Sequence, residues 1–323
     1  MTATNLPLPA CAVDVVEEGG RAKREFVRCE IGRHLYFSSQ GLESYLFAKP
    51  EPLIHDALLV AAAVEFCDRL RQRSSVVWGR SFSLRLPVYE VDRWRTSAVT
   101  DALIDALDFV TGDRWTIHFR PRRQAAMWLR QEQFDLSHHK RAVMPFSDGL
   151  DSWSVATLED ANARGLLRVR LGKAPPPRPA RGREPAFTRI PYKVKFHEHR
   201  DRESSSRSRG FKFAMMSGIA AYLAKVDGII LPESGQGIIG PAMIVPGQAA
   251  PDYRCHPRFT TKMERLVMEL FGHRVRYKFP RLWNTKGETL RAAISAAASA
   301  SGWDDTRSCW QSQRHMSIDG ERR

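Results

Sequence analysis

The stretch AVMPFSDGLDSWSVATLEDA, residues 142–161, decides the fold of the C-terminal half of the chain. A short apolar run ending at Phe146 predicts a buried strand, and the residues from Ser152 onward carry a helical pattern. Ligands of open parallel sheets bind outside the carboxyl ends of the strands. A tight turn from strand to helix presents backbone N–H groups there, together with the positive end of the helix dipole. The stretch therefore predicts a pyrophosphate site.

Each residue type in this turn has a chemical reason to be there. Gly149 permits the sharp bend, and the hydroxyls of Ser147 and Ser152 add hydrogen-bond donors. Asp151 can hold the helix N-terminus or a magnesium ion. The alternative is a capped helix that simply follows a buried strand. The predicted nucleotide-binding residues are Ser147, Asp148, Gly149, Leu150, Asp151 and Ser152.

Strands and helices alternate throughout the C-terminal half, which predicts an α/β fold with a doubly wound, mostly parallel sheet. The expected strands are 141–146, 165–172, 189–196, 227–233 and 274–280, and the expected helices are 152–164, 208–226, 257–271 and 286–300. The first 135 or so residues predict a small α+β domain with strands 25–37, 81–91 and 114–122 and helices 52–73 and 96–113. We place the domains at 1–137 and 138–323.

Composition restricts the class of protein. No run of about 18 apolar residues is present, so we expect no membrane span. The five cysteines are scattered, which fits a reducing cytoplasm better than a disulfide framework.

The net charge of +14 is unevenly distributed, because residues 164–210 hold 14 Lys and Arg against 4 Asp and Glu. This segment is either a solvated basic loop or a landing site for an anionic ligand such as ATP, nucleic acid or an acidic protein. Within it, residues 173–185 are rich in Pro, Arg and Gly and predict a flexible connection.

The turn at 147–152 resembles the SGGxDS signature of the PP-loop ATP pyrophosphatases, which belong to the adenine nucleotide α-hydrolase type. Three later segments resemble 7-cyano-7-deazaguanine synthase (QueC), and they follow in the same order. These are ESSSRSRGFKFAMMSGIAAY at 203–222, FPRLWNTKGETLRAA at 279–293 and DDTRSCWQSQRH at 304–315. The layout of the chain, with an extra N-terminal domain ahead of these segments, is most similar to the divergent QueC-like proteins of bacterial anti-phage islands. The segments LPESG at 231–235 and RCHPRF at 254–259 also resemble segments of those proteins.

The resemblance implies further site residues. Lys286, beside the expected helix cap Thr285, would face ATP phosphates or the substrate carboxylate, and Arg207 and Arg209 would clamp phosphate. We therefore predict Asp151, Lys286 and Arg207 as catalytic residues and Arg209 as a substrate contact. Glu233 is a further predicted substrate contact, because it lies at the end of the strand 227–233. Without a ligand, these side chains would be a solvated helix lysine, part of the basic loop and a strand-end carboxylate.

A zinc site is also implied, because the cysteine that matches Cys309 joins a downstream C-G-x-C-x-x-C cluster in the synthases. No such cluster follows Cys309 before Arg323, so we expect an incomplete zinc segment. His315, Cys255 and His256 are the further candidate ligands.

The resemblance implies a cytoplasmic ATP-dependent C–N ligase that uses ATP and Mg²⁺. Such an enzyme adenylates the carboxylate of a 7-deazaguanine base and then forms an amide or a nitrile, as in queuosine biosynthesis. A defence-type relative would instead conjugate the base to an acceptor amine, for example on a protein or a subunit of a defence complex. Two alternatives stay open. One is a PP-loop enzyme that modifies RNA, bound through 164–210. The other is a non-catalytic scaffold, favoured by Asp148 at a glycine position of the signature.

Overall fold

A computed structural model gives the fold and describes most of the chain. The described residues are 8–45, 51–74, 79–124, 140–147, 149–162, 165–172, 188–197, 203, 206–239, 252–297, 303, 306, 317–318 and 321–322.

The C-terminal half is built on a five-stranded parallel sheet, here called the C-terminal sheet. Its strands, in spatial order, are β11 (Arg276–Lys278), β10 (Gly228–Ile230), β6 (Ala142–Pro145), β7 (Leu166–Leu171) and β8 (Thr188–Ile190). The chain therefore builds outward from β6 in one direction and then returns to the other side of β6 with β10. The point where the strand order reverses lies between β6 and β10, and this is where open α/β sheets bind ligands.

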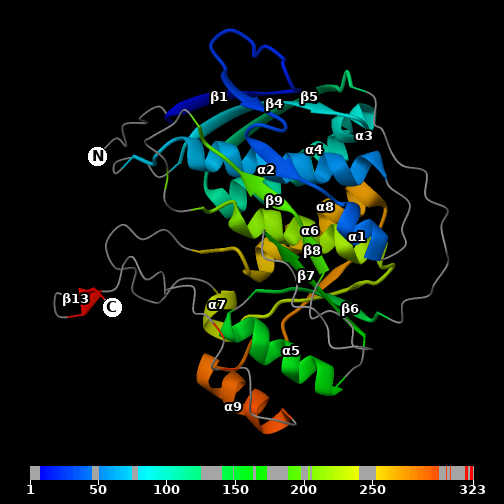
Figure 1. Ribbon diagram of the computed structural model, residues 1–323, viewed down its shortest axis with the longest axis vertical. Coiled ribbons are helices and arrows are strands. Elements are labelled where there is room, and N and C mark those ends of the chain that lie inside the picture. The colour runs from blue at the N-terminus through cyan, green and yellow to red at the C-terminus, as the bar shows by residue number, and fades with distance from the viewer. Residues whose placement is uncertain are drawn as a thin grey trace, which may run out of the picture.

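Helices cover both faces of this sheet (Figure 1). On one face lie α6 (Arg209–Leu223) and α8 (Pro257–Phe271), and on the other lie α5 (Leu150–Asn162) and α9 (Lys286–Ala296). The expected α/β class and mostly parallel sheet are thus confirmed. The short helix α7 (Gly235–Ile239) follows β10, and the small antiparallel pair β12 (Ser317–Ile318) and β13 (Glu321–Arg322) lies near the C-terminus.

The N-terminal half contains a second parallel sheet, the N-terminal sheet, and not the predicted α+β arrangement. Its spatial order is β2 (Val27–Glu30), β1 (Ala10–Val16), β4 (Ser81–Val88) and β5 (Arg114–Pro121). The prediction was wrong because it missed β1, the strand that joins β2 to β4. The long helices α2 (Pro52–Leu70) and α4 (Ser97–Thr111) pack against this sheet, and α1 (Gln40–Tyr45) and α3 (Val91–Arg95) are short connecting helices.

The two halves pack through their helices, with α2 against α6 and α4 against α8 (Figure 1). One continuous hydrophobic core includes Phe66 of α2, Leu103 of α4, Phe211 of α6 and Leu266 of α8. A short antiparallel pair, β3 (Leu35–Phe37) with β9 (Tyr192–Val194), also joins the halves. The predicted single strands 25–37 and 189–196 are therefore each two strands, whose second members form this junction.

The predicted connection 173–185 lies outside the described residues. The strands of the N-terminal sheet all precede residue 122 and those of the C-terminal sheet all follow residue 141. The predicted boundary between residues 137 and 138 falls between these two sets of strands.

Candidate functional site

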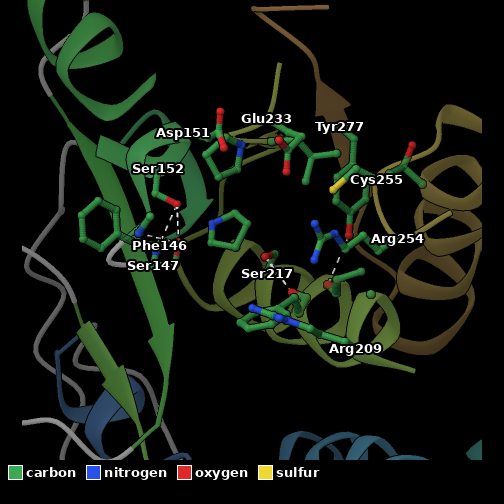
Figure 2. Close-up of a pocket in the computed structure, with 18 of the residues that line it drawn as sticks. Phe146, Ser147, Asp151, Ser152, Arg209, Ser217, Glu233, Arg254, Cys255 and Tyr277 are labelled. Atoms are coloured by element: carbon green, nitrogen blue, oxygen red, sulfur yellow. Dashed lines mark hydrogen bonds between the residues drawn. The ribbon is translucent and has the colours of Figure 1, made fainter. Parts of the chain in front are cut away.

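A cavity of about 220 Å³ opens where the strand order of the C-terminal sheet reverses. The turn after β6 forms one side, and the residues after β10 together with the start of α6 form the other (Figure 2). The lining residues are Pro145, Phe146, Ser147, Gly149, Leu150, Asp151, Ser152, Arg209, Gly210, Phe213, Ala214, Ser217, Leu231, Pro232, Glu233, Arg254, Cys255, Thr260, Tyr277 and Lys286. The structure therefore brings together the predicted nucleotide loop, Lys286, Arg209 and Glu233.

The turn after β6 is held by its own serines. The Ser152 hydroxyl accepts a hydrogen bond from the Ser147 amide at 3.2 Å and lies 2.8 Å from the Ser147 hydroxyl. The Ser147 hydroxyl in turn accepts from the Gly149 amide at 3.2 Å. These bonds hold the turn at the start of α5, whose first residues Leu150, Asp151 and Ser152 line the cavity. First-turn amides have no acceptor inside their own helix and suit a bound anion.

Asp151 and Lys286 form an ion pair across the mouth of the cavity. The Lys286 ammonium lies 2.7 Å from Oδ2 of Asp151, and the lysine side chain remains half exposed. Lys286 is the first residue of α9, where Thr285 and Glu288 form a reciprocal capping box. The capping box fixes the direction in which the helix begins, and so it fixes the position of Lys286 at the site.

Asp151 is also the residue that fits a magnesium ion best. Its Oδ1 is buried and has no hydrogen-bond partner among the described residues. Magnesium in phosphate-binding sites is held by one or two carboxylates together with the phosphates of the ligand, so a single Asp is sufficient. Among the described residues, no group of three or more His, Cys, Asp or Glu is placed to hold a metal ion by protein side chains alone.

Two arginines face the nucleotide loop from the opposite wall (Figure 2). Arg209 is the first residue of α6, and its guanidinium lies 5.6 Å from the ring centre of Phe213. Arg254 belongs to the turn before α8, and its guanidinium pairs with Asp252 at 3.1 Å. Gly210 lies between them and has no room for a side chain, because an added Cβ would be 2.6 Å from Cβ of Arg254. The cavity thus has positive groups on both sides.

Three groups in the cavity wall have a raised pKa. Burial, reinforced by the nearby Asp151 carboxylate, raises the pKa of Glu233 above its ordinary value. Burial also raises the pKa of Cys255 to about 12, so this thiol is protonated at neutral pH. The Tyr277 hydroxyl donates to the carbonyl of Ala214 at 3.2 Å, and burial raises its pKa as well. A neutral Glu233 carboxyl can both donate and accept hydrogen bonds, as a heterocyclic base requires.

The structure does not bring Arg207 to this cavity. Arg207 precedes α6, and its guanidinium donates to the carbonyl of Thr111 at the C-terminal end of α4, 3.2 Å away. Burial, and then the nearby Arg73, lowers its pKa. Arg207 was predicted as a catalytic residue, but it lies between the two halves of the chain and does not line the cavity. Asp148 and Cys309 lie outside the described residues, as does His315.

Among the lining residues that the sequence did not predict as ligand contacts are Arg254, Tyr277 and Phe213. Arg254 lies in the segment 254–259, which resembles a segment of the QueC-like proteins. That resemblance does not indicate which side chain faces the cavity. Tyr277 and Phe213 are indistinguishable in sequence from core residues of a strand and a helix. Cys255, considered for zinc, lies in the cavity wall, while His256 caps α8 by accepting from the Arg258 amide at 3.1 Å.

Comparisons with known proteins identify no family to which this site could be assigned. No protein-family model matches the chain. No curated protein and no solved structure gives a significant match either. Among the described residues, no helix combines the length and the apolar character that crossing a membrane requires. The assignment of function therefore rests on the chemistry of the cavity.

Proposed function

We propose that the chain is a PP-loop ATP pyrophosphatase of the QueC-like type, which adenylates a carboxylate on a 7-deazaguanine base. The observation that carries this proposal is the cavity between β6 and β10. There the turn 147–152 and Lys286 face Arg209 and Arg254 across a space of about 220 Å³. A triphosphate needs first-turn amides and a cation on one side, and a carboxylate substrate needs positive groups on the other.

In this proposal the phosphates of ATP lie against the first turn of α5 and the Lys286 ammonium. Asp151 holds Lys286 in place. Its Oδ1 would also bind Mg²⁺, and the ion would supply positive charge to the phosphates. Arg209 and Arg254 hold the substrate carboxylate near the α-phosphorus. A carboxylate oxygen then forms a bond to the α-phosphorus and pyrophosphate leaves, so that the products of this step are an acyl adenylate and pyrophosphate.

Adenylation converts a poor leaving group into a good one. An amine can then attack the acyl carbon, forming an amide and releasing AMP and a proton. The Glu233 carboxyl, whose pKa is raised by burial, lines the cavity, where it can hydrogen-bond the edge of the base. The acceptor is ammonia or an amine of a partner molecule. The scattered cysteines of the sequence fit a reducing cytoplasm, where we place this activity.

Calorimetry with Mg-ATP tests the binding step. Ser152→Ala removes the hydroxyl that holds Ser147, so we expect the affinity for Mg-ATP to fall about tenfold or more, as for loss of a hydrogen bond that supports a charged ligand. Ser154→Ala is the matched control, because Ser154 is equally buried on α5 but does not line the cavity. Equal affinities in the wild type and Ser152→Ala would remove the turn from the site.

A second measurement separates the enzyme from the non-catalytic alternative. We expect the wild type to release AMP and pyrophosphate when Mg-ATP and a 7-carboxy-7-deazaguanine are both present. Binding of Mg-ATP without formation of AMP would instead assign the chain as a scaffold that retains the nucleotide site.

A further inference from the structure

A buried network of charges connects α2 of the N-terminal half with the start of α6. Asp68, near the end of α2, is fully buried and pairs with Arg80 at 2.6 Å and with Arg73 at 3.0 Å. Asp113, in the turn between α4 and β5, pairs with the same two arginines at 2.8 Å and 2.7 Å. Arg80 is itself fully buried, so each charge in the network depends on the others.

One oxygen of the Asp68 carboxylate bonds outside this network, to the C-terminal half of the chain. Its Oδ2 accepts a hydrogen bond at 2.8 Å from the backbone amide of Ser208, the residue that caps α6. The Ser208 side chain makes no capping bond to its own helix. The carboxylate of Asp68 therefore satisfies the cap amide of a helix to which it does not belong.

Helix α9, which also begins at the cavity, shows what the bond to Asp68 replaces. In α9 the cap residue Thr285 receives a reciprocal bond from Glu288, three residues later, whose carboxylate accepts from the Thr285 amide at 2.7 Å. The equivalent position of α6 is Phe211, which has no acceptor. Asp68 thus takes the part that the glutamate of a capping box plays within one helix. In both helices the next residue after the cap, Lys286 or Arg209, lines the cavity.

The start of α6 also fixes the second arginine of the cavity wall. Gly210 lies directly against Arg254, where an added Cβ would be 2.6 Å from Cβ and 2.7 Å from Cα of Arg254. Movement of the first turn of α6 would therefore displace both Arg209 and Arg254. The carboxylate of Asp68, anchored by Arg73 and Arg80, opposes such a movement.

We propose that Asp68 is a positioning residue of the cavity, through which the N-terminal half of the chain holds Arg209 and Arg254 in register with the nucleotide turn. This inference rests on the proposed function for its binding readout. It gives the N-terminal domain a definite role, which is to complete the anion-binding wall of a site built on the C-terminal sheet.

The test compares Asp68→Asn with Asp56→Asn, because both aspartates are fully buried on α2. Asp56 accepts from the amides of Tyr89 and Glu90, all within the N-terminal half. An asparagine at 68 can present its single oxygen to the arginines or to Ser208, but not to both. We expect Asp68→Asn to weaken Mg-ATP binding about tenfold, the loss of one hydrogen bond to a charged group, and Asp56→Asn to leave it unchanged. Equal weakening in the two variants would overturn the proposal.

A double-mutant cycle with Arg209→Gln shows whether Asp68 acts through that side chain. If it does, Asp68→Asn has little further effect on affinity once Arg209 is replaced. Additive losses in the double variant would mean that Asp68 does not act through Arg209, and the proposal would fail.

Hydrogen exchange separates failure of this inference from failure of the proposed function, since it needs no ligand. In the wild-type protein we expect a slowly exchanging amide at Ser208, and in Asp68→Asn faster exchange at residues 208–212, with no such change in Asp56→Asn. A rapidly exchanging Ser208 amide in the wild type would overturn the proposal even if no variant folds. Absence of Mg-ATP binding in the wild type, with this exchange pattern intact, would reject the proposed function alone.

Discussion

The two parallel sheets differ in what occupies their carboxyl edges. In the N-terminal sheet, the amides beyond the strand ends donate to the chain's own carboxylates. Glu17, directly after β1, accepts from the amides of Arg123 and Gln124 at 3.1 Å and 2.9 Å. Asp56 accepts from the amides of Tyr89 and Glu90, which follow β4, at 3.0 Å and 2.9 Å. In the C-terminal sheet the corresponding place is the cavity, where serine hydroxyls shape the turn.

This difference shows how one type of sheet edge can be either closed or open to ligands. The strand order reverses within both sheets, between β1 and β4 in one and between β6 and β10 in the other. At the carboxyl edge of each sheet, this point presents amides and positive potential to an anion. A built-in carboxylate occupies that position in the first sheet and contributes to stability. The turn after β6 uses neutral serines instead, which leaves the position available to the phosphates of a ligand.

The largest effect that tests this comparison is expected at Asp56. Replacing it by alanine leaves the part-buried amides of Tyr89 and Glu90 without this acceptor and removes a fully buried side chain, which should lower the free energy of unfolding by about 2–5 kcal/mol. Asp56→Asn keeps an acceptor and should cost less. Chemical denaturation of the three proteins measures both values. A cost near zero for the alanine variant would show that the carboxylate does not close this edge.

The pH dependence of stability provides a further check on Asp56. Burial raises the pKa of this carboxyl to about 6, despite the bonds from the Glu90 and Tyr89 amides. The folded protein therefore keeps this proton over a range in which the unfolded chain releases it. Wild-type stability should fall as the pH rises from about 4 towards about 6, and Asp56→Asn should lack this component of the slope. Identical slopes in the two proteins would contradict the assignment.

A smaller effect is expected at Glu17, where the edge can be opened by mutation. Burial acts to raise the pKa of Glu17, but the amides of Gln124 and Arg123 and the Arg122 guanidinium outweigh it and hold the pKa below its usual value. Glu17→Ala should lower the stability by about 1–3 kcal/mol and create a vacant anion position. Thermal melting in formate against chloride at equal ionic strength should then show a larger gain for Glu17→Ala than for the wild type. An equal gain in both would mean that no anion position is created.

The smallest effect is expected at Glu233, in the open edge. Burial and Asp151 raise the pKa of this carboxyl, so it ionises as the pH rises above the ordinary glutamate range. Ionisation adds a negative charge to the cavity that takes the phosphates, and the affinity for Mg-ATP should fall by about two- to fivefold across that titration. Glu233→Gln should bind with an affinity that does not change over the same range. A retained pH dependence in this variant would assign the titration to another group.

The sequence predicted the C-terminal sheet well because strands such as β6 and β10 are apolar runs next to a strongly patterned helix. It also predicted the turn 147–152, since serine, glycine and aspartate after a buried strand have few other uses. It failed for β1 because ACAVDVV lacks regular alternation, and for the split strands because β3 and β9 pair only across the two halves. Arg207 and Arg209 are two residues apart in one basic segment, and only the position at which α6 begins decides which of them reaches the cavity.

The most direct test of the central claim is amide hydrogen exchange of the whole chain with and without Mg-ATP. The two carboxyl edges are then compared in one experiment. We predict slower exchange with Mg-ATP at residues 146–153, 231–233 and 284–288, around the cavity of the C-terminal sheet. We predict no change at residues 15–19, 88–90 and 121–124, where the chain's own carboxylates already occupy the N-terminal edge. Protection at the N-terminal edge, or at neither edge, would contradict the account.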